Sequence, residues 1–163
     1  MRAVYTYLTR ISLLLLFLVG FQSHAQNVNW VSWEEAVQLS QTDAQPKKIF
    51  IDVYTDWCGW CKKMDRDTYA DADIKKLISD NAVAIKINPE KNNTYKIGDN
   101  TYTGTELMKF LAGGKLYKSY PTTYFWLDPA NLTKGRKKYM QMGYLDKAQM
   151  TEVMNKMIKI KKN

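Results

Sequence analysis

The sequence is poor in the side chains from which most catalytic and metal sites are built. Its 163 residues include one histidine, His24, and two cysteines, Cys58 and Cys61. A structural zinc site takes four ligands, typically a second Cys pair or a His pair, so two cysteines alone do not predict one. A Ser–His or Cys–His catalytic pair needs a histidine inside the folded domain. His24 is therefore a candidate only if the N-terminal segment belongs to that domain.

The chain has one long apolar run, near its N-terminus, and that run is too short to cross a bilayer. Residues 11–21 are apolar apart from a serine and a glycine, which makes about 11 residues against the ~20 of a membrane-spanning helix. Two arginines precede this run, and Ser23-His24-Ala25 follows it with small residues at both ends. The pattern predicts a secretory signal peptide over residues 1–25. An uncleaved anchor is the alternative, and no cysteine follows the run to carry a lipid.

Cleavage after Ala25 would remove the only histidine and leave one exported domain, residues 26–163. Its length suits a single domain with a sizeable core. The leader contains two arginines and no acidic residue, so its loss lowers the net charge from +8 to +6. The lysines are spread along the chain, and the densest group lies near the C-terminus, where cations suit the end of a helix. We therefore expect a soluble monomer with solvated basic faces and no nucleic-acid partner, in the periplasm or another extracytoplasmic compartment.

The two cysteines stand two residues apart at the start of a predicted helix. An apolar, β-branched run over residues 49–54 predicts a buried strand before them, and a charged stretch over 62–67 predicts a helix after them. A thiol at a helix N-terminus meets unpaired backbone N–H groups and the positive end of the helix dipole, which favour the thiolate. A purely structural disulfide that closes so small a loop would remove little chain entropy. The arrangement of Cys58 and Cys61 therefore indicates a dithiol redox site.

Periodicity predicts that helices and strands alternate around this site. We expect helices over residues 32–42, 58–68, 71–81, 103–111 and 146–158. We expect strands over residues 48–54, 83–88, 123–127 and 137–142, a loop over 91–103 and a turn over 128–131. An apolar stripe in the last helix is expected to fill the core: Met150, Val153, Met154, Met157 and Ile158. A crossover at the front and a hairpin at the rear give an α/β fold, with a mixed central sheet flanked by helices on both faces.

The residues around the cysteines resemble the thioredoxin family, and the resemblance extends over nearly all of residues 26–163. Six of them stand where thioredoxins have the buried acid, the tryptophan before the nucleophile, the two cysteines with their glycine and the following lysine: Asp52, Trp57, Cys58, Gly59, Cys61 and Lys62. The segment 120–122 (Tyr-Pro-Thr) resembles the cis-proline segment of the family, and Gly143 precedes the last helix as it does there. With the signal peptide, these features are most similar to periplasmic thiol:disulfide interchange proteins. The resemblance implies a thioredoxin-like fold.

Two features depart from thioredoxin itself. Trp60 stands where thioredoxin has a proline between the cysteines, so the redox potential of thioredoxin does not carry over. The stretch from residue 88 to residue 121 is also longer than in thioredoxin and includes an asparagine-rich segment. The surface beside the cysteines is therefore expected to differ from that of thioredoxin.

The chemistry of a dithiol and the resemblance together imply a mechanism. Cys58, expected to be the more exposed thiol with the lower pKa, would attack a substrate disulfide, and Cys61 would then attack Cys58 and release the reduced substrate. Asp52 would take up and return the proton of Cys61, because burial raises the pKa of a carboxyl group toward the range that proton exchange needs. The alternative is that Asp52 is a charged residue at a strand end that reaches solvent. Lys86 matches the lysine that approaches this acid in thioredoxins, and an ordinary exposed strand lysine is the alternative.

The same resemblance implies how a substrate binds. A cis Pro121 would present the backbone of Tyr120 to a substrate strand. Trp57, Gly59 and Trp60 would provide the contact surface beside the cysteines. The dithiol itself would be the only redox group, with no cofactor and no metal.

The residues between the cysteines bear on the direction of electron flow. Strong oxidants owe their potential to a heavily stabilised thiolate, and Gly59 and Trp60 provide neither a charge nor a histidine for that purpose. We therefore expect a protein-disulfide reductase or electron relay, with protein thiols and disulfides as substrates and a membrane electron carrier as partner. A disulfide oxidase or isomerase and a non-catalytic binding or chaperone module are the alternatives. A thiol peroxidase would need an arginine or threonine near the nucleophile, and neither Arg66 nor Arg136 is placed for that role by the sequence.

Overall fold

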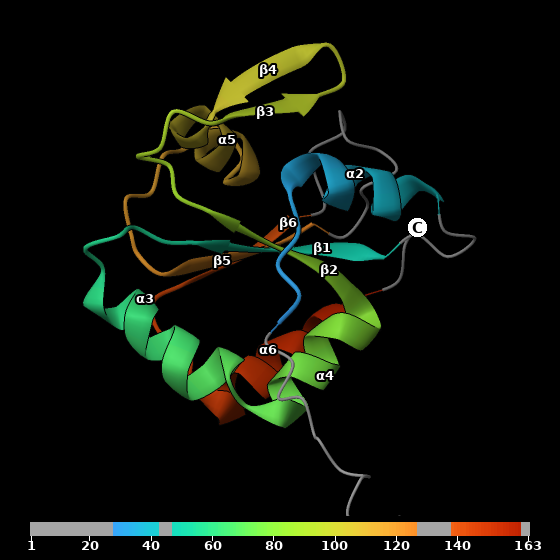
Figure 1. Cartoon of the computed structure of the whole chain (residues 1–163), viewed down its shortest axis with the longest axis vertical. Helices are drawn as coiled ribbons and strands as arrows, with labels where there is room; N and C mark the ends of the chain where they lie inside the picture. The colour runs from blue at the N-terminus through green and yellow to red at the C-terminus, as the bar shows by residue number, and fades with distance from the viewer. Residues whose placement is uncertain (1–27, 43–46, 127–137, 161–163) are drawn as a thin grey trace, which may run out of the picture.

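The structure is a computed structural model that describes residues 28–42, 47–126 and 138–160 (Figure 1). The signal peptide expected over residues 1–25 and the turn expected over 128–131 lie outside the described residues. The described elements follow the predicted order, with bounds that differ by one or two residues. Two differences in kind occur, at the asparagine-rich segment and at the end of the helix that follows the cysteines.

A four-stranded mixed sheet forms the centre of the fold (Figure 1). Strand β1 (Lys48–Val53) pairs in parallel with β2 (Ala82–Ile87) and antiparallel with β5 (Thr122–Trp126). Strand β5 also pairs antiparallel with β6 (Lys138–Met142), which gives the order β2-β1-β5-β6. The parallel pair and the rear hairpin are both as predicted.

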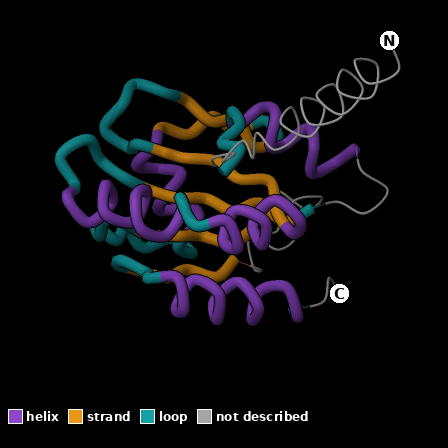
Figure 2. Tube along the Cα trace, turned by 60° about the horizontal axis from the view of Figure 1, so that its bottom comes forward, coloured by secondary structure: helices purple, strands orange, loops and turns teal. Residues whose placement is uncertain are grey.

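Helices cover both faces of this sheet (Figures 1 and 2). Helices α2 (Trp33–Thr42) and α5 (Gly104–Leu111) pack on one face. Helices α3 (Gly59–Met64), α4 (Ala72–Asn81) and α6 (Lys147–Lys159) pack on the other. The predicted layers are thereby confirmed.

The side chains of β1 divide between the two faces, as the pleat of a strand requires. Ile49, Ile51 and Val53 are fully buried against α2 and α5, whereas Phe50 is buried against α3, α4 and α6. By the same alternation, Asp52 lies on the Phe50 face, on the side of α3. One acidic side chain is thus held in the apolar centre of the molecule.

The last helix, α6, agrees well with the prediction made from helical periodicity. Asp146 and Gln149 form a capping box at its start, and Met150, Met154 and Met157 are buried under the sheet. Each fully buried methionine contributes about 1.5–3 kcal/mol relative to an exposed one. The three methionines of the predicted stripe therefore fill the core as expected, whereas its other two members, Val153 and Ile158, are only half-buried.

The asparagine-rich segment over residues 91–103 is not the predicted loop. It contains a two-stranded hairpin, β3 (Thr94–Ile97) and β4 (Asn100–Thr103), joined by a two-residue turn with Gly98 at a φ of 59°. Tyr95 and Ile97 are 6% and 1% exposed and pack into the α2–α5 side of the core. Two buried side chains at a spacing of two are enough to fix the hairpin, but the polar residues between and around them conceal the alternation.

The helix that begins at the cysteines also differs from the prediction of one helix over residues 58–68. Helix α3 ends at Met64 and continues as a π-helix, η1 (Asp65–Tyr69). In η1 the Thr68 hydroxyl donates a hydrogen bond of 2.6 Å to the carbonyl of Leu145, and Tyr69 packs edge-on against Phe50. Both contacts are made with distant parts of the chain, so periodicity over five residues could not reveal the wider turn.

Candidate functional site

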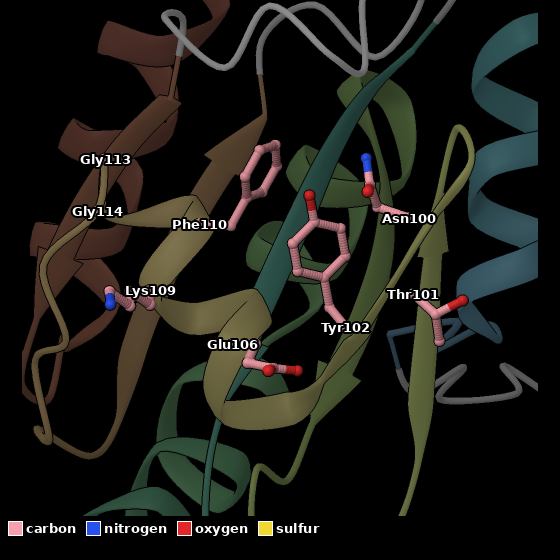
Figure 3. Close-up of a pocket in the computed structure, with 8 residues that line it drawn as sticks. All are labelled: Asn100, Thr101, Tyr102, Glu106, Lys109, Phe110, Gly113 and Gly114. Atoms are coloured by element: carbon pink, nitrogen blue, oxygen red, sulfur yellow. The ribbon is translucent and has the colours of Figure 1, made fainter.

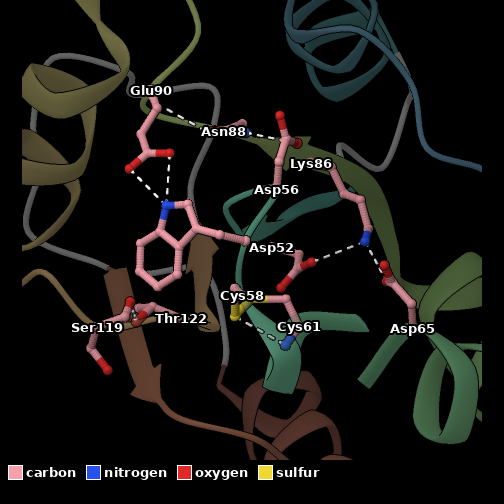
Figure 4. The surroundings of a disulfide bond; sticks show 11 residues. Asp52, Asp56, Cys58, Cys61, Asp65, Lys86, Asn88, Glu90, Ser119 and Thr122 are labelled. Atoms are coloured by element: carbon pink, nitrogen blue, oxygen red, sulfur yellow. Dashed lines mark hydrogen bonds and ion pairs between the residues drawn. A yellow bond between two sulfur atoms is a disulfide. The ribbon is translucent and has the colours of Figure 1, made fainter. Parts of the chain in front are cut away.

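The two cysteines form a disulfide bond at the start of α3 (Figure 4). Cys58 is the N-cap residue of the helix, and its backbone N–H donates to the carbonyl of Thr55 at 3.1 Å. The backbone N–H of Cys61 donates to the sulfur of Cys58 at 3.0 Å. This N–H is one of the unpaired donors of the first helical turn, so the helix directs a hydrogen-bond donor at one sulfur only.

The prediction that Cys58 is the more exposed cysteine is wrong for this disulfide form, because both cysteines are 3% exposed. The exposed surface of the motif belongs instead to Trp57 and Trp60, which are 67% and 59% exposed, and to Gly59. Exposure therefore does not distinguish the two sulfurs. The hydrogen bond from the Cys61 N–H distinguishes them, because it is donated to the sulfur of Cys58 and a bond of this kind favours the thiolate.

Asp52 and Lys86 are brought together by strand register. They are direct partners in the parallel β1–β2 ladder, and the Lys86 Nζ lies 3.4 Å from an Asp52 carboxylate oxygen (Figure 4). The two side chains are 3% and 19% exposed, which supports the predicted buried acid and excludes an ordinary exposed strand lysine. Lys86 also forms an ion pair with Asp65, the first residue of η1, whose side chain is 47% exposed. One ammonium thus joins a buried carboxylate to a solvent-facing one.

Burial controls the protonation of Asp52. Loss of solvent raises the pKa of its carboxyl group, the charge of Lys86 opposes this rise and the charge of Asp65 adds to it, and the pKa of Asp52 reaches about 6. The second carboxylate oxygen of Asp52 is buried and has no hydrogen-bond partner among the described residues. The carboxyl group can therefore exist in both protonation states near neutral pH, as proton exchange requires.

Trp57 is held in place by two contacts on one side of the disulfide. Its indole N–H donates to both carboxylate oxygens of Glu90, at 3.1 and 3.0 Å. Its ring meets the ring of Tyr120 edge-on, with centroids 5.8 Å apart. Glu90 belongs to the loop after β2, where Asn88 donates to Asp56 at 3.2 Å. This loop therefore supports the segment that leads into the disulfide.

Trp60 forms a second aromatic pair, with Tyr144. The rings of Trp60 and Tyr144 are 5.5 Å apart, and the ammonium of Lys63 lies 5.1 Å from the centre of the Tyr144 ring. Tyr144 follows Gly143, whose φ of 89° favours glycine. Exposed aromatic surface thus flanks the disulfide at both Trp57 and Trp60.

The segment before β5 lies next to these rings. The peptide bond between Tyr120 and Pro121 is cis, and the carbonyl of Pro121 accepts a hydrogen bond of 2.8 Å from the N–H of Gly143. The hydroxyl of Thr122 donates to the carbonyl of Ser119 at 2.6 Å (Figure 4). In the part of the chain that the structure describes, the backbone groups of Tyr120 have no hydrogen-bond partner. They are free to pair with another strand.

Sequence reasoning missed three contributors to this site. Asp65 stands four residues after Cys61, one helical turn away, and that spacing was the one signal available. Glu90 lies 33 residues from Trp57, and Tyr144 is still further from Trp60, so no local pattern connects either pair. These residues are found only once the chain has folded.

A separate groove of about 520 Å³ lies between β4 and α5. The rings of Tyr102 and Phe110 lie along it, 5.2 Å apart, with Glu106 and Lys109 on the helix beside them (Figure 3). None of its lining residues belongs to the disulfide site. Across the described residues, no group of three or more His, Cys, Asp or Glu side chains could hold a metal ion. No described helix combines the length and apolar character that crossing a bilayer requires.

Two solved structures share this fold. A structure titled DsbH Oxidoreductase superposes with a TM-score of 0.59 at 20% identity, covering 87% of this chain and 92% of that one. A thioredoxin from Thermus thermophilus superposes with a TM-score of 0.58 at 16% identity, covering 80% and 87%. At these identities the similarity shows the fold alone. The fold and the disulfide at the start of α3 define a thioredoxin-family protein with a cysteine-pair site.

The chain belongs to the family described as Thioredox_DsbH, Protein of unknown function, DUF255, which matches residues 18–162. Among curated relatives, the thiol:disulfide interchange protein DsbD of Colwellia psychrerythraea is 32% identical over 68 residues, which is 37% of this chain and 11% of that protein. The uncharacterized protein B0495.5 of Caenorhabditis elegans and human spermatogenesis-associated protein 20 are 34% and 31% identical over 70 residues each, 42% of this chain and 9% of theirs. The match thus spans about a tenth of the length of these relatives.

Proposed function

We propose that this protein is a thiol–disulfide oxidoreductase that exchanges its Cys58–Cys61 disulfide with cysteines of other proteins. The observation that carries the proposal is the cysteine pair at the start of α3, with a backbone N–H directed at the Cys58 sulfur and a buried carboxyl group on the adjacent strand. A fold alone does not fix a function, so the proposal rests on this site. The name of the DsbD relative, a thiol:disulfide interchange protein, agrees with it.

The first step joins the reduced protein to its substrate. The Cys58 thiolate attacks one sulfur of a substrate disulfide, so a new S–S bond forms to Cys58 and the other substrate sulfur leaves as a thiolate that takes a proton from water. The N–H of Cys61 stabilises the Cys58 thiolate before attack.

The second step releases the substrate. The Cys61 thiol gives its proton to the Asp52 carboxylate and attacks the Cys58 sulfur, which expels the second substrate sulfur as a thiolate. Two electrons have then passed to the substrate, and the protein holds the disulfide. A pKa of about 6 makes Asp52 a proton acceptor that is mostly ionised at neutral pH. Lys86 and Asp65 connect it to solvent.

The substrate binds as an extended strand beside the disulfide. The unpaired backbone groups of Tyr120 provide main-chain hydrogen bonds, as an exposed sheet edge does for an added strand. The exposed rings of Trp57 and Trp60, the residues next to Cys58 and Cys61 in the sequence, provide apolar contact area. An extended peptide with apolar residues next to its cysteine is the form that fits these groups.

We further propose that the protein works as a reductant or electron relay. No charge stands between the cysteines, and the Asp52 carboxylate disfavours a second negative charge close to it, so the thiolate is not stabilised to the extent that strong oxidants need. Outside the cytoplasm such a reductant needs a source of electrons, and we propose a carrier in the membrane as that partner. Export by the leader over residues 1–25 is checked by N-terminal sequencing of the exported protein, which should begin at Gln26.

The competing proposal is a binding or chaperone module that keeps the scaffold without the chemistry. Insulin reduction with dithiothreitol as electron source separates the two. We expect the mature protein to accelerate precipitation of the insulin B chain and the Cys58→Ser variant to show only the uncatalysed rate. Equal rates for the two proteins would contradict the oxidoreductase proposal.

A further inference from the structure

The ammonium group of Lys86 lies among three aromatic rings. Its Nζ is 5.1 Å from the ring centre of Trp30, 5.0 Å from that of Tyr54 and 5.6 Å from that of Tyr69. Each distance is within the ~6 Å over which a cation is attracted to the face of a ring. We call these three side chains the aromatic box.

Trp30 is fixed in the box by both its side chain and its backbone. Its ring meets Tyr69 edge-on at 5.0 Å and lies 6.1 Å from the ring of Phe50. Its backbone forms a parallel bridge with Ala84, two residues before Lys86 on β2, and the next N–H along the chain donates to the Ala84 carbonyl at 2.9 Å. The segment before α2 is thus attached to the strand that carries Lys86.

The box leaves the Lys86 ammonium two charged partners. One is the buried Asp52, 3.4 Å away, and the other is the more exposed Asp65. A lysine side chain has four flexible bonds and a strongly hydrated head group, so on an open surface the ammonium would turn to water and to the exposed carboxylate. The attraction of the ammonium to the three nearby rings opposes that movement.

We propose that Trp30 is a positioning residue of the redox centre, whose ring closes the aromatic box and holds the Lys86 ammonium against Asp52. The inference rests on the proposed function only in its consequence for disulfide exchange. Trp30 lies 28 residues before Cys58 in the sequence, in a segment with no motif of its own. It acts on the exchange through Lys86 and Asp52 without touching either cysteine in the described contacts.

The consequence concerns the proton held by Asp52. The groups that face this carboxyl are Lys86 on β2, Asp65 and Tyr69 on η1, and Thr123, its partner on β5. Of these, Lys86 is the positively charged group and the main one that lowers the pKa of Asp52; Tyr69 lowers it less, whereas burial and Asp65 raise it. Opening the box lets Lys86 move toward Asp65 and water, so Asp52 binds its proton more tightly.

Titration of the Asp52 carboxyl carbon by NMR tests the inference in the oxidised protein without any activity assay. Trp30→Met, which fills the core but has no ring face, should raise the proton affinity of Asp52 by roughly threefold to tenfold, the worth of a partly desolvated cation–ring contact. Trp30→Phe keeps a ring and should titrate close to the unchanged protein. An Asp52 titration that Trp30→Met leaves unchanged would overturn the inference.

Two further variants show whether the effect passes through Lys86. Lys86→Met should raise the proton affinity of Asp52, and adding Trp30→Met to it should cause no further change; a full additional shift would contradict the inference. Trp33→Leu is the matched control, because Trp33 packs against Tyr95 and Trp126 on the other face of the sheet. An equal shift in that control would mean a general loosening and would also contradict it.

The design separates this inference from the proposed function. If Trp30→Met does not fold, Tyr54→Leu removes another wall of the box from a half-buried position, and an unchanged Asp52 titration there counts against the box. A chain that fails to reduce insulin but shows the Trp30 effect would contradict the oxidoreductase proposal and leave the box intact. A chain that reduces insulin but shows no Trp30 effect would contradict the aromatic box and leave the oxidoreductase proposal intact.

Discussion

Asp52 and Lys86 face each other across the parallel β1–β2 ladder, with the Lys86 Nζ 3.4 Å from the Asp52 carboxylate and Asp52 almost wholly buried. The pair does not neutralise the effect of burial, because the pKa of Asp52 is still raised from 3.8 to about 6. An ionisable group kept in this state lowers stability at neutral pH, and such groups are typical of functional sites. The stability and the chemistry of the molecule are therefore linked at one residue.

The first prediction concerns the stability of Asp52→Asn as a function of pH. The folded protein binds the proton of the Asp52 carboxyl group more tightly than the unfolded chain does. Proton binding by Asp52 therefore contributes its full stabilisation below pH 3.8, and this stabilisation is lost as the pH rises through about 6. That loss amounts to about 3 kcal/mol at 1.36 kcal/mol per pH unit. Above pH 6, Asp52→Asn should therefore be more stable than the unchanged protein by up to this amount. Urea unfolding at pH 4, 6 and 8 measures it, and parallel pH profiles for the two proteins would contradict the raised pKa.

The second prediction concerns the rate of substrate release. Asp52→Asn should slow resolution of the mixed disulfide by at least about tenfold near neutral pH, since general bases typically contribute 10²–10⁴-fold. Rapid-quench kinetics with a preformed mixed disulfide isolates this step. An unchanged rate from pH 6 to pH 9 would exclude Asp52 as the proton acceptor.

The third prediction assigns roles to the two cysteines. Cys58→Ser should abolish exchange, whereas Cys61→Ser should accumulate covalent adducts with substrate proteins, because the attacking sulfur remains and the resolving one is gone. Limiting alkylation of the reduced protein near pH 7 should label Cys58 first. Preferential labelling of Cys61 would reverse the two roles.

The fourth prediction links the hairpin and α5 to the disulfide. A Cβ atom on Gly104 would lie 2.6 Å from the backbone Cα of Pro89, next to Glu90, the residue that holds Trp57. Gly104→Ala should destabilise the protein by about 1–3 kcal/mol and change the fluorescence of Trp57, since the loop after β2 must move. Gly59→Ala is the control, because a Cβ there meets no atom within 4 Å. Equal stability of the two variants would show that the loop moves freely.

Much of the fold could be predicted because its signals are local. The capping box of Asp146 and Gln149, the methionine stripe and the β-branched run of β1 each lie within one element. The hairpin of β3 and β4 escaped prediction because only Tyr95 and Ile97 bury their side chains, too few to show against the surrounding polar residues. The π-helix escaped prediction because its contacts, such as the hydrogen bond from Thr68 to Leu145, are made with residues far along the chain.

The site divides in the same way. Part of the site is recognisable from short motifs. Asp52 and the cysteine pair lie close together in the sequence, and the segment around Pro121 matches a known family. The hydrogen bonds between Glu90 and Trp57 and the position of Trp30 over Lys86 depend on strand pairing and loop packing. Contacts of this kind join residues far apart in the sequence and produce no periodic pattern, so they are seen only in the folded structure.

The central claim is that Cys58 and Cys61 form a redox couple that exchanges with external thiols. Equilibration of the mature protein with glutathione mixtures, followed by trapping of free thiols, measures the potential of that couple directly. We expect one reversible two-electron transition toward the thioredoxin end of the scale, between about −270 and −230 mV. A disulfide that never exchanges with glutathione would contradict the redox claim itself. A midpoint above about −160 mV would contradict the proposed role as a reductant or relay.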